Sequence, residues 1–254
     1  MSSPYSVHER PTASDVRSSP GAPTVKPMGY AHIFTSVRTE NAAFENDPLL
    51  RYVRNAPDAR FGDIYRAVAF VAQLVLDVHR EEALTIGNGD AFVTYLLKED
   101  PFYGVVFPLL KKLDVFSSPE QHRRRTEWFE KRQVAFKEAF GENLDDMIYL
   151  MELATSPQKQ GLGYGSKLIQ AVTDLADATE RRVWLTSSNV ANTTFYEHAG
   201  FVTLAEFTVG DSNPTWTESP IRVQIMSREP RRPDGLIVST DMSNLIRRRV
   251  PSQR

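Results

Sequence analysis

Two spacings of apolar residues run along the chain, and together they predict a mixture of helices and strands. Apolar residues recur three or four positions apart over 64–79 and again from Ser166 onward, which is the spacing of one helix face. Short runs of β-branched and aromatic residues, typical of strands, occur at 30–37, 83–86, 91–97, 147–154, 182–186, 201–209 and 221–226. Further helices are expected at 41–55, 103–116, 118–140 and 192–198. These elements indicate an α/β domain.

Three local features refine this outline. Residues 87–90, Gly-Asn-Gly-Asp, separate two strand-like runs and predict an antiparallel hairpin. Pro48 is expected in the first turn of a helix or between two short helices. The helix predicted at 118–140 is dense in Arg, Lys and Glu, which indicates a helix face exposed to solvent.

Composition divides the 254 residues into three segments. Residues 1–27 are rich in Ser and Pro and are expected to form a disordered leader, because they cannot bury enough apolar surface to order themselves. The folded domain is expected to span 28–229, and a basic flexible tail to span 230–254. No window approaches the roughly 18 uninterrupted apolar residues of a membrane span. The N-terminus lacks the apolar run of a secretory signal, so the cytoplasm is the expected location, with the nucleus left open.

Charge and cysteine content exclude several function classes. The sequence has no cysteine, which rules out disulfides, zinc–thiolate sites and a cysteine nucleophile. Its five histidines are scattered, and no metal site is expected. A net charge of -2 gives no reason to expect a polyanionic partner. Only Arg247–Arg249 favours nucleic-acid binding, which is therefore a minor alternative.

A glycine-rich loop between a predicted strand and a predicted helix points to anion binding. The segment Gln160-Gly-Leu-Gly-Tyr-Gly165 places glycines at alternate positions, so main-chain amides can approach a ligand without interference from side chains. A helix that starts there adds partial positive charge. A dinucleotide fingerprint would need glycine at Ser166, and a Walker A loop would need Ser or Thr after Lys167. Both of these alternatives fail.

The pattern that does fit is [QR]-x-x-G-x-[GA], with Gln160, Gly163 and Gly165 at its set positions. One helix and one strand later stands 189–201, Asn-Val-Ala-Asn-Thr-Thr-Phe-Tyr-Glu-His-Ala-Gly-Phe, which looks like N-x-x-[AN]-x-x-[FL]-Y-x-x-x-G-F. With both motifs in this order, the chain resembles the GNAT superfamily of N-acetyltransferases. The resemblance covers about 147–226. Upstream, only the order of the elements is compatible with it.

The resemblance implies a GNAT fold, in which helices flank a central mixed, mostly antiparallel, splayed sheet. It implies acetyl-CoA as cosubstrate, with its pyrophosphate held by Gln160, Gly161, Gly163, Tyr164, Gly165 and Ser166. Leu153 and Thr155 would offer backbone groups to the pantetheine amides. Asn189 would bond the pantetheine arm, or alternatively cap the following helix.

Two residues match the family's catalytic positions. Tyr196 would donate a proton to the thiolate leaving group, the alternative being a half-buried core tyrosine. Glu152 is the one acid within the strand-like run 147–154 and would act as the base, the alternative being a solvent-facing position. An attacking amine must be neutral, and the leaving thiolate benefits from a proton.

These residues predict direct transfer of acetyl from acetyl-CoA to a primary amine in a ternary complex. A small-molecule acceptor is expected, and protein amino groups are the alternative. A non-catalytic acyl-CoA-binding module is the rival from another class. In the family the acceptor contacts correspond to 41–80 and 210–220 here, where Asp47, Asp63, Asp211 and Glu218 are acidic candidates for binding a cationic amine, although solvated surface positions explain each as well. A homodimer is left open.

Overall fold

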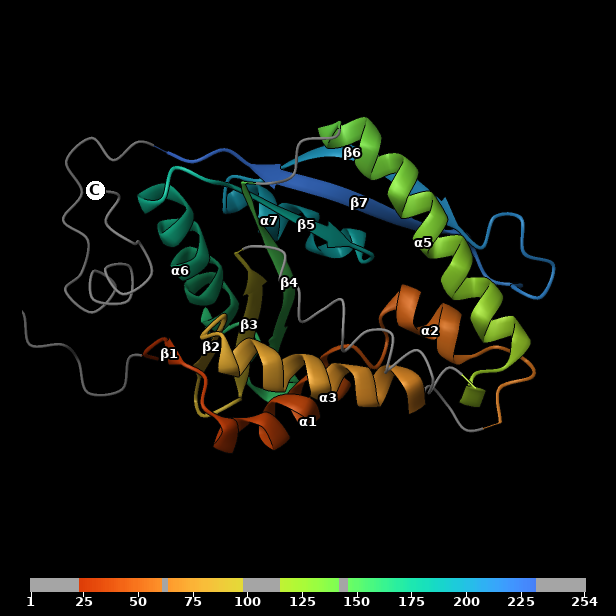
Figure 1. Cartoon of the computed structure of the whole chain (residues 1–254), viewed down its shortest axis with the longest axis horizontal. Helices are drawn as coiled ribbons and strands as arrows, with labels where there is room; N and C mark the ends of the chain where they lie inside the picture. The colour runs from red at the N-terminus through yellow and green to blue at the C-terminus, as the bar shows by residue number, and fades with distance from the viewer. Residues whose placement is uncertain (1–22, 61–63, 98–114, 142–145, 232–254) are drawn as a thin grey trace, which may run out of the picture.

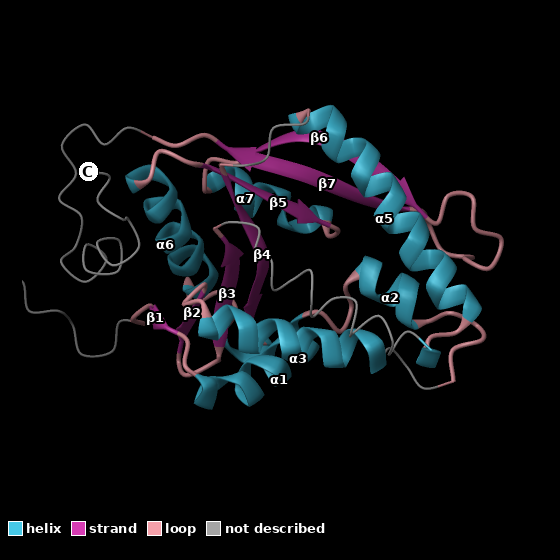
Figure 2. Ribbon diagram, viewed as in Figure 1, coloured by secondary structure: helices cyan, strands magenta, loops and turns pink. Residues whose placement is uncertain are grey.

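A computed structural model describes residues 23–60, 64–97, 115–141 and 146–231. Its centre is a seven-stranded sheet in the order β1-β2-β3-β4-β5-β7-β6. The strands are β1 Lys26–Pro27, β2 Ala83–Ile86, β3 Ala91–Leu96, β4 Met147–Thr155, β5 Arg182–Ser187, β6 Val202–Val209 and β7 Ile221–Arg228. Only β4 and β5 pair in parallel among these. The predicted mixed, mostly antiparallel sheet flanked by helices is confirmed (Figure 2).

Helices cover both faces of this sheet (Figure 1). They are α1 Ile33–Ala43, α2 Pro48–Arg54, α3 Ile64–His79, α5 Pro119–Phe140, α6 Tyr164–Ala178 and α7 Thr193–His198. Helix α6 packs on one face of the half formed by β2 to β5, and α1 and α3 pack on the opposite face. Helix α5 crosses β6 and β7, with α2 beside it. The sheet therefore has a half covered on two sides and a second half held by α5.

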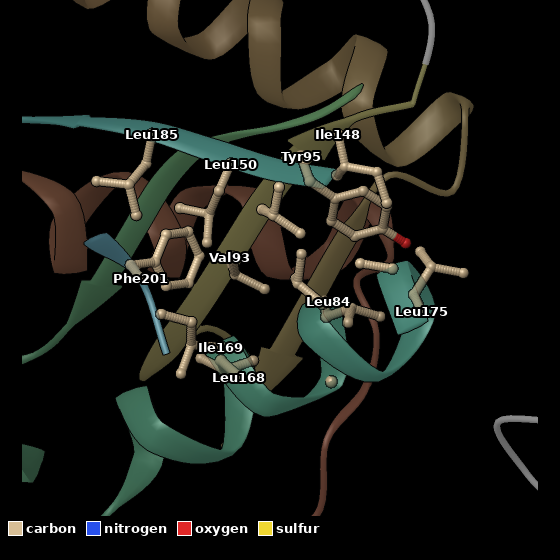
Figure 3. Packing of buried hydrophobic residues seen from close by; sticks show 14 of the residues in the cluster. Leu84, Val93, Tyr95, Ile148, Leu150, Leu168, Ile169, Leu175, Leu185 and Phe201 are labelled. Atoms are coloured by element: carbon tan, nitrogen blue, oxygen red, sulfur yellow. The ribbon is translucent and has the colours of Figure 1, made fainter. Parts of the chain in front are cut away.

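The core under α6 follows from the apolar stripe of that helix. Leu168 and Ile169 point from the helix toward Val93 and Leu150 on the sheet, and Phe201 closes one end of the cluster (Figure 3). Burying each such side chain contributes roughly 1.5–3 kcal/mol. This packing fixes the first turn of α6, and with it the glycine loop, against the end of β4.

The strand predicted at 30–37 is wrong. Residues 30–32 form a 3-10 turn, and α1 follows directly at Ile33. The β-type composition of this stretch is overridden by tertiary packing, because Ile33, Ser36 and Glu40 are buried at helical spacing. The first strand is instead the two-residue β1, which pairs with β2.

Other boundaries differ by smaller amounts. Pro48 does separate two helices, and Asp47 caps the second of them by accepting a bond from Leu50 N–H at 2.9 Å. The helix expected from Ser166 already begins at Tyr164. The helix predicted at 103–116 lies almost entirely outside the described residues, as do most of the predicted leader and tail.

The helix predicted at 118–140 is present as α5, but its interpretation as a purely solvated face is wrong. Arg124 is fully buried, and Glu120 is 7% exposed. Charged side chains are usually exposed because water solvates them, but they can be buried where other protein groups pair with them. Here the Arg124 guanidinium bonds Glu120 at 2.8 Å and the carbonyl and hydroxyl oxygens of Thr215 at 3.0 and 2.8 Å.

The parallel strands β4 and β5 part after three residue pairs. They pair from Met147↔Arg182 to Tyr149↔Trp184, and β4 then continues to Thr155 without β5 as a neighbour. The last pair is held by the rings of Tyr149 and Trp184, which stack with their centroids 3.9 Å apart. On its other edge, β5 pairs with β7 from Val183 to Ser187. The two halves of the sheet therefore diverge from this aromatic pair onward.

Candidate active site

The glycine loop joins the end of β4 to the start of α6. Gly161 and Gly163 have φ angles of 75° and 77°, the left-handed region that favours glycine. A Cβ added at either position would meet nothing within 4 Å. The space beside these two residues is therefore open to a ligand.

Main-chain amides provide the anion-binding capacity of this loop. A helix leaves its first N–H groups without intrahelical partners, and Gly163 caps α6 with no side-chain hydrogen bond. The backbone bond that returns to the loop runs from Lys167 N–H to Gly163 O at 3.1 Å, so the amides of 164–166 precede it. Amides exposed at a helix start with its dipole behind them fit the charge of a diphosphate.

The other loop residues predicted to bind the cosubstrate divide by role. Gly165 has an ordinary φ and lies in α6, where an added Cβ would make an ordinary contact with Phe195 at 3.5 Å, so neither the backbone nor the packing of the protein itself requires glycine there. Gln160 donates from Nε2 to Thr155 O at 3.2 Å and so ties the loop to the strand end. Tyr164 packs against the α6 core, while Ser166 is exposed.

Leu153 and Thr155 lie on the part of β4 that has left β5. They pair with Val93 and Ala91 of β3 on one side, while β5 no longer lies beside them on the other. The structure thus brings both residues to an open strand edge that ends at the glycine loop. An open edge presents backbone N–H and C=O groups to an extended ligand.

A β-bulge determines where Glu152 points. The register of β3 and β4 passes from Thr94↔Glu152 to Tyr95↔Leu150, so Met151 is the extra residue. Before the bulge Leu150 faces the α6 core, and after it Leu153 does so, while Ala154 faces α1 and α3. Because a bulge shifts the alternation by one residue, Glu152 is placed on the side of α1 and α3. Glu152 also lies on the part of β4 that has no β5 neighbour, so the alternative of an edge position describes it as well.

Several acids surround Glu152 on that side. Loss of hydration, followed by the negative charge of Glu40, raises the pKa of Glu152 to about 8, while Arg66 acts in the opposite direction. Glu152 as a whole residue is partly exposed, while its carboxyl group is largely removed from water. A carboxyl with a pKa near neutrality suits proton transfer.

Glu40 and Arg66 were missed by the sequence analysis. Glu40 is 1% exposed, and its Oε1 accepts a bond from Arg66 Nη1 at 2.6 Å. Its Oε2 is buried with no hydrogen-bond partner among the described residues. The sequence does indicate this position: Glu40 lies one helical turn after Ser36, and both are on the buried face of α1. Because a strand was predicted at 30–37, the helical spacing of these two residues was not considered.

Tyr196 lies on α7 beside the divergence of β4 and β5. Its ring packs edge-on against Phe195 and Phe201, with centroids 5.2 and 6.0 Å away. Burial and then the charge of Glu152 raise the pKa of Tyr196 above its usual range, so the phenol stays protonated. The charge of Glu152 thus acts on this phenol, although the two residues come from elements far apart in the sequence.

Asn189 caps the turn that precedes α7. Its Oδ1 accepts a bond from Ala191 N–H at 3.1 Å, so the capping role expected as an alternative is present. A contact with the pantetheine arm stays a prediction for the same side chain. The cap fixes the path of the chain between β5 and Tyr196.

Three of the four acidic side chains that were candidates for binding a cationic amine already have protein partners. Asp211 and Glu218 form ion pairs with Lys131 and Arg51. Asp47 accepts from Ser188 Oγ at 2.8 Å in addition to capping α2. Asp63 lies outside the described residues.

The described residues contain neither a membrane-spanning helix nor a metal-binding cluster. None of the helices in these ranges combines the length and apolar character needed to cross a bilayer. The same ranges hold no group of three or more His, Asp or Glu side chains arranged for a metal ion.

Comparisons with known proteins agree with this architecture. The model of the acetyltransferase (GNAT) domain matches residues 127–203. An uncharacterized N-acetyltransferase of Schizosaccharomyces pombe is 33% identical over 86 residues, which are 34% of this chain and 33% of that protein. The match thus spans about a third of the length of this curated relative.

Solved structures share the fold at low identity. Arylalkylamine N-acetyltransferase 2 of Aedes aegypti gives a TM-score of 0.59 at 14% identity, covering 83% of this chain and 100% of that one. The polyamine N-acetyltransferase of Drosophila melanogaster gives a TM-score of 0.58 at 13% identity, covering 82% and 99%. At such identities the likeness concerns the fold.

Proposed function

We propose that the chain is an N-acetyltransferase of the GNAT superfamily, and that it transfers acetyl from acetyl-CoA to the primary amine of a small molecule in a ternary complex. The observation that carries this proposal is the opening between β4 and β5 beyond Tyr149. The glycine loop lies at its end, and the charge of Glu152 acts on Tyr196. Solved relatives of the same fold are named for acetylating arylalkylamines and polyamines.

The cosubstrate would lie along this opening. Amides at the start of α6, together with Gln160, would hold the diphosphate. Leu153 and Thr155 would bond the pantetheine amides from the free edge of β4, with Asn189 on the opposite side. The thioester would then lie between the diverging strands, near Glu152 and Tyr196.

Proton transfers complete the reaction. Glu152, once ionised, accepts the proton that the acceptor ammonium must lose before its nitrogen can attack the thioester carbonyl. Collapse of the tetrahedral intermediate breaks the carbon–sulfur bond, and Tyr196 donates its phenolic proton to the departing thiolate. The nitrogen, which carries one proton more than the amide product, returns a proton to the Tyr196 phenolate. An acetyl-enzyme intermediate on cysteine is excluded because the sequence contains no cysteine.

The experiment is a thiol-release assay with acetyl-CoA and a panel of monoamines, diamines, amino acids and N-terminal peptides. Tyr196→Phe should lower kcat at least tenfold with little change in KM, because a general acid contributes to the transition state. Tyr149→Phe is the matched control, since it loses a hydroxyl at the aromatic pair where the strands part. An equal rate for Tyr196→Phe and wild type would remove Tyr196 from the mechanism.

The same assay separates the alternatives. Tight binding of acetyl-CoA without thiol release on any amine would favour a non-catalytic acyl-CoA-binding module. Turnover on peptides alone would favour a protein-directed enzyme.

A further inference from the structure

A cavity of about 670 Å³ lies between the start of α2, the turn after β5 and the loop that joins β6 to β7. This volume is within the range of small-molecule sites, which are commonly about 300–1,000 Å³. Trp216, Pro48, Pro220 and Val190 form much of the apolar part of its lining, and polar and charged side chains supply the other half. The body of a ligand here would meet an indole and aliphatic side chains.

The tryptophan in this wall is held on several sides. Its Nε1 donates to Ser219 O at 3.0 Å, and the Tyr52 ring packs edge-on with the centroids 5.1 Å apart. An added Cβ at Gly210 would come within 2.7 Å of the indole, so the backbone itself approaches the ring closely. Side chains fixed in this way form a preorganised binding surface, which reduces the entropy cost of binding.

Arg124 joins the cavity wall to the rest of the fold. Its guanidinium lies over the rings of Tyr52 and Trp216, at 4.7 and 5.5 Å from their centroids. The same group donates to Tyr52 O on α2 and to Thr215 O on the loop. Burial on its own would raise the pKa of its partner Glu120, yet hydrogen bonds, led by the one from Thr215, lower that pKa to about 2.

One side of the cavity is joined to a carboxylate. Ser188 lines the cavity and donates to Asp47 Oδ2 at 2.8 Å. The charge of Asp47 in turn acts on Glu152. An amine whose nitrogen lies beside Ser188 would therefore be near the negative charge of Asp47.

The charged groups that line the cavity are neutralised in pairs. Arg51 pairs with Glu218 at 2.8 Å, and Arg222 pairs with Glu206 at 2.5 Å. A second ionic group on a ligand would have to break one of these pairs or remain without a counter-charge. A ligand with a single charge at its reacting end avoids that cost.

We propose that this cavity is the acceptor site and that it selects a primary monoamine with a flat apolar body and no second charge. The inference rests on the transferase function proposed above. The apolar lining would receive the body, and the ammonium would point past Ser188 toward Asp47 and Glu152. Diamines and amino acids would enter less well, because the ion pairs leave no partner for their second charge.

The substrate test compares 2-phenylethylamine with phenylalanine, which adds a carboxylate, and with 1,4-diaminobutane, which adds an ammonium. The expected kcat/KM for 2-phenylethylamine exceeds both others at least tenfold. A preference for either doubly charged compound would overturn the selectivity.

The site itself is tested by filling the cavity. Thr217 is exposed and lines it, whereas Ser212 is exposed on the same loop and does not. Thr217→Trp should raise the KM for 2-phenylethylamine at least tenfold and leave the KM for acetyl-CoA within twofold, while Ser212→Trp should change neither. An active Thr217→Trp enzyme with an unchanged amine KM would overturn the site yet leave the transferase intact. A wild-type chain that releases no thiol with any amine would overturn both.

Discussion

The two halves of the sheet offer different surfaces to the two proposed ligands. At the end of β4 the surface proposed for the diphosphate is backbone, because Gly161 and Gly163 present amides with open space beside them. Beyond β5 the cavity wall is made of side chains that Arg124 holds from beneath. A phosphate is the same on every molecule of cosubstrate, so a fixed backbone loop suffices for it. An acceptor requires a surface whose shape and charge depend on side chains.

The difference predicts that the second half is the more fragile. Arg124→Met removes the guanidinium and leaves Glu120 buried without that partner, so we expect a loss of about 3–5 kcal/mol in the free energy of unfolding. Urea unfolding measures this change. The acceptor KM should rise as well, while acetyl-CoA affinity stays within twofold, because Arg124 does not contact the glycine loop.

Arg123→Met is the control for that substitution. Arg123 pairs with the same glutamate on the same helix, but its side chain is 53% exposed, and exposed pairs contribute about 1 kcal/mol or less. Equal losses for the two variants would show that the wall does not depend on the buried guanidinium.

In the half of the sheet that ends at the glycine loop, adding a side chain at a glycine should weaken binding of acetyl-CoA. Gly163→Val places a branched side chain in the open space proposed for the diphosphate and strains a φ of 77°. We expect acetyl-CoA affinity to fall about 100-fold, roughly 2.8 kcal/mol, by isothermal titration calorimetry.

Gly141 offers a matched position at the end of α5. Its φ is 69°, and an added Cβ would also meet nothing within 4 Å. Its ψ of -138° is less accessible to a branched residue than the 9° of Gly163. Gly141→Val should therefore cost at least as much stability without changing affinity for acetyl-CoA. If both valines weaken binding equally, the glycine loop is not the diphosphate site.

The role of Glu152, which lies where the two halves of the sheet part, is tested by the pH dependence of kcat/KM. Because the pKa of Glu152 is about 8, its ionised fraction, and with it kcat/KM, should fall about tenfold for each pH unit below that value. Glu152→Gln should be at least tenfold slower at pH 8 and should lack this slope. The ratio of wild-type to variant rates cancels the titration of the amine itself and should keep the slope that belongs to Glu152.

Asp77 is a useful comparison, since burial raises its pKa to about 8 as well. Both acids bind protons more tightly when folded, so stability is present below the unfolded pKa near 4 and is lost as pH rises toward 8. Asp77→Asn and Glu152→Gln should each reduce that loss in thermal melts from pH 5 to 8. Only Glu152→Gln should remove the slope in activity, and removal of that slope by Asp77→Asn would contradict the assignment of the base.

The two halves also differ in how far the sequence predicts them. The glycine loop and the helix of Tyr196 are local patterns, so spacing along the chain was enough to indicate both. The direction of Glu152 was not predictable, because it depends on the bulge at Met151, which exists only in the pairing with β3.

Arg124 shows the same limit more strongly. A run of three arginines is locally typical of a solvated face, and nothing nearby distinguishes the middle one. Its acceptors Tyr52 O and Thr215 O are 72 and 91 residues away along the chain. Burial of this kind follows from tertiary packing, which a single sequence does not encode in any local spacing.

The smallest predicted effect concerns the charge pattern of the acceptor cavity. Glu218→Gln leaves Arg51 without its partner at the cavity wall, and a free cation there would attract the carboxylate of phenylalanine. Exposed ion pairs contribute about 0.2–1 kcal/mol, so kcat/KM for phenylalanine should rise about two- to fivefold, with 2-phenylethylamine unchanged. Glu229→Gln provides the control, because it breaks a similar exposed pair, with Arg182, that does not line the cavity. If Glu218→Gln shifts both substrates equally, the ion pair supports the loop and takes no part in excluding a second charge.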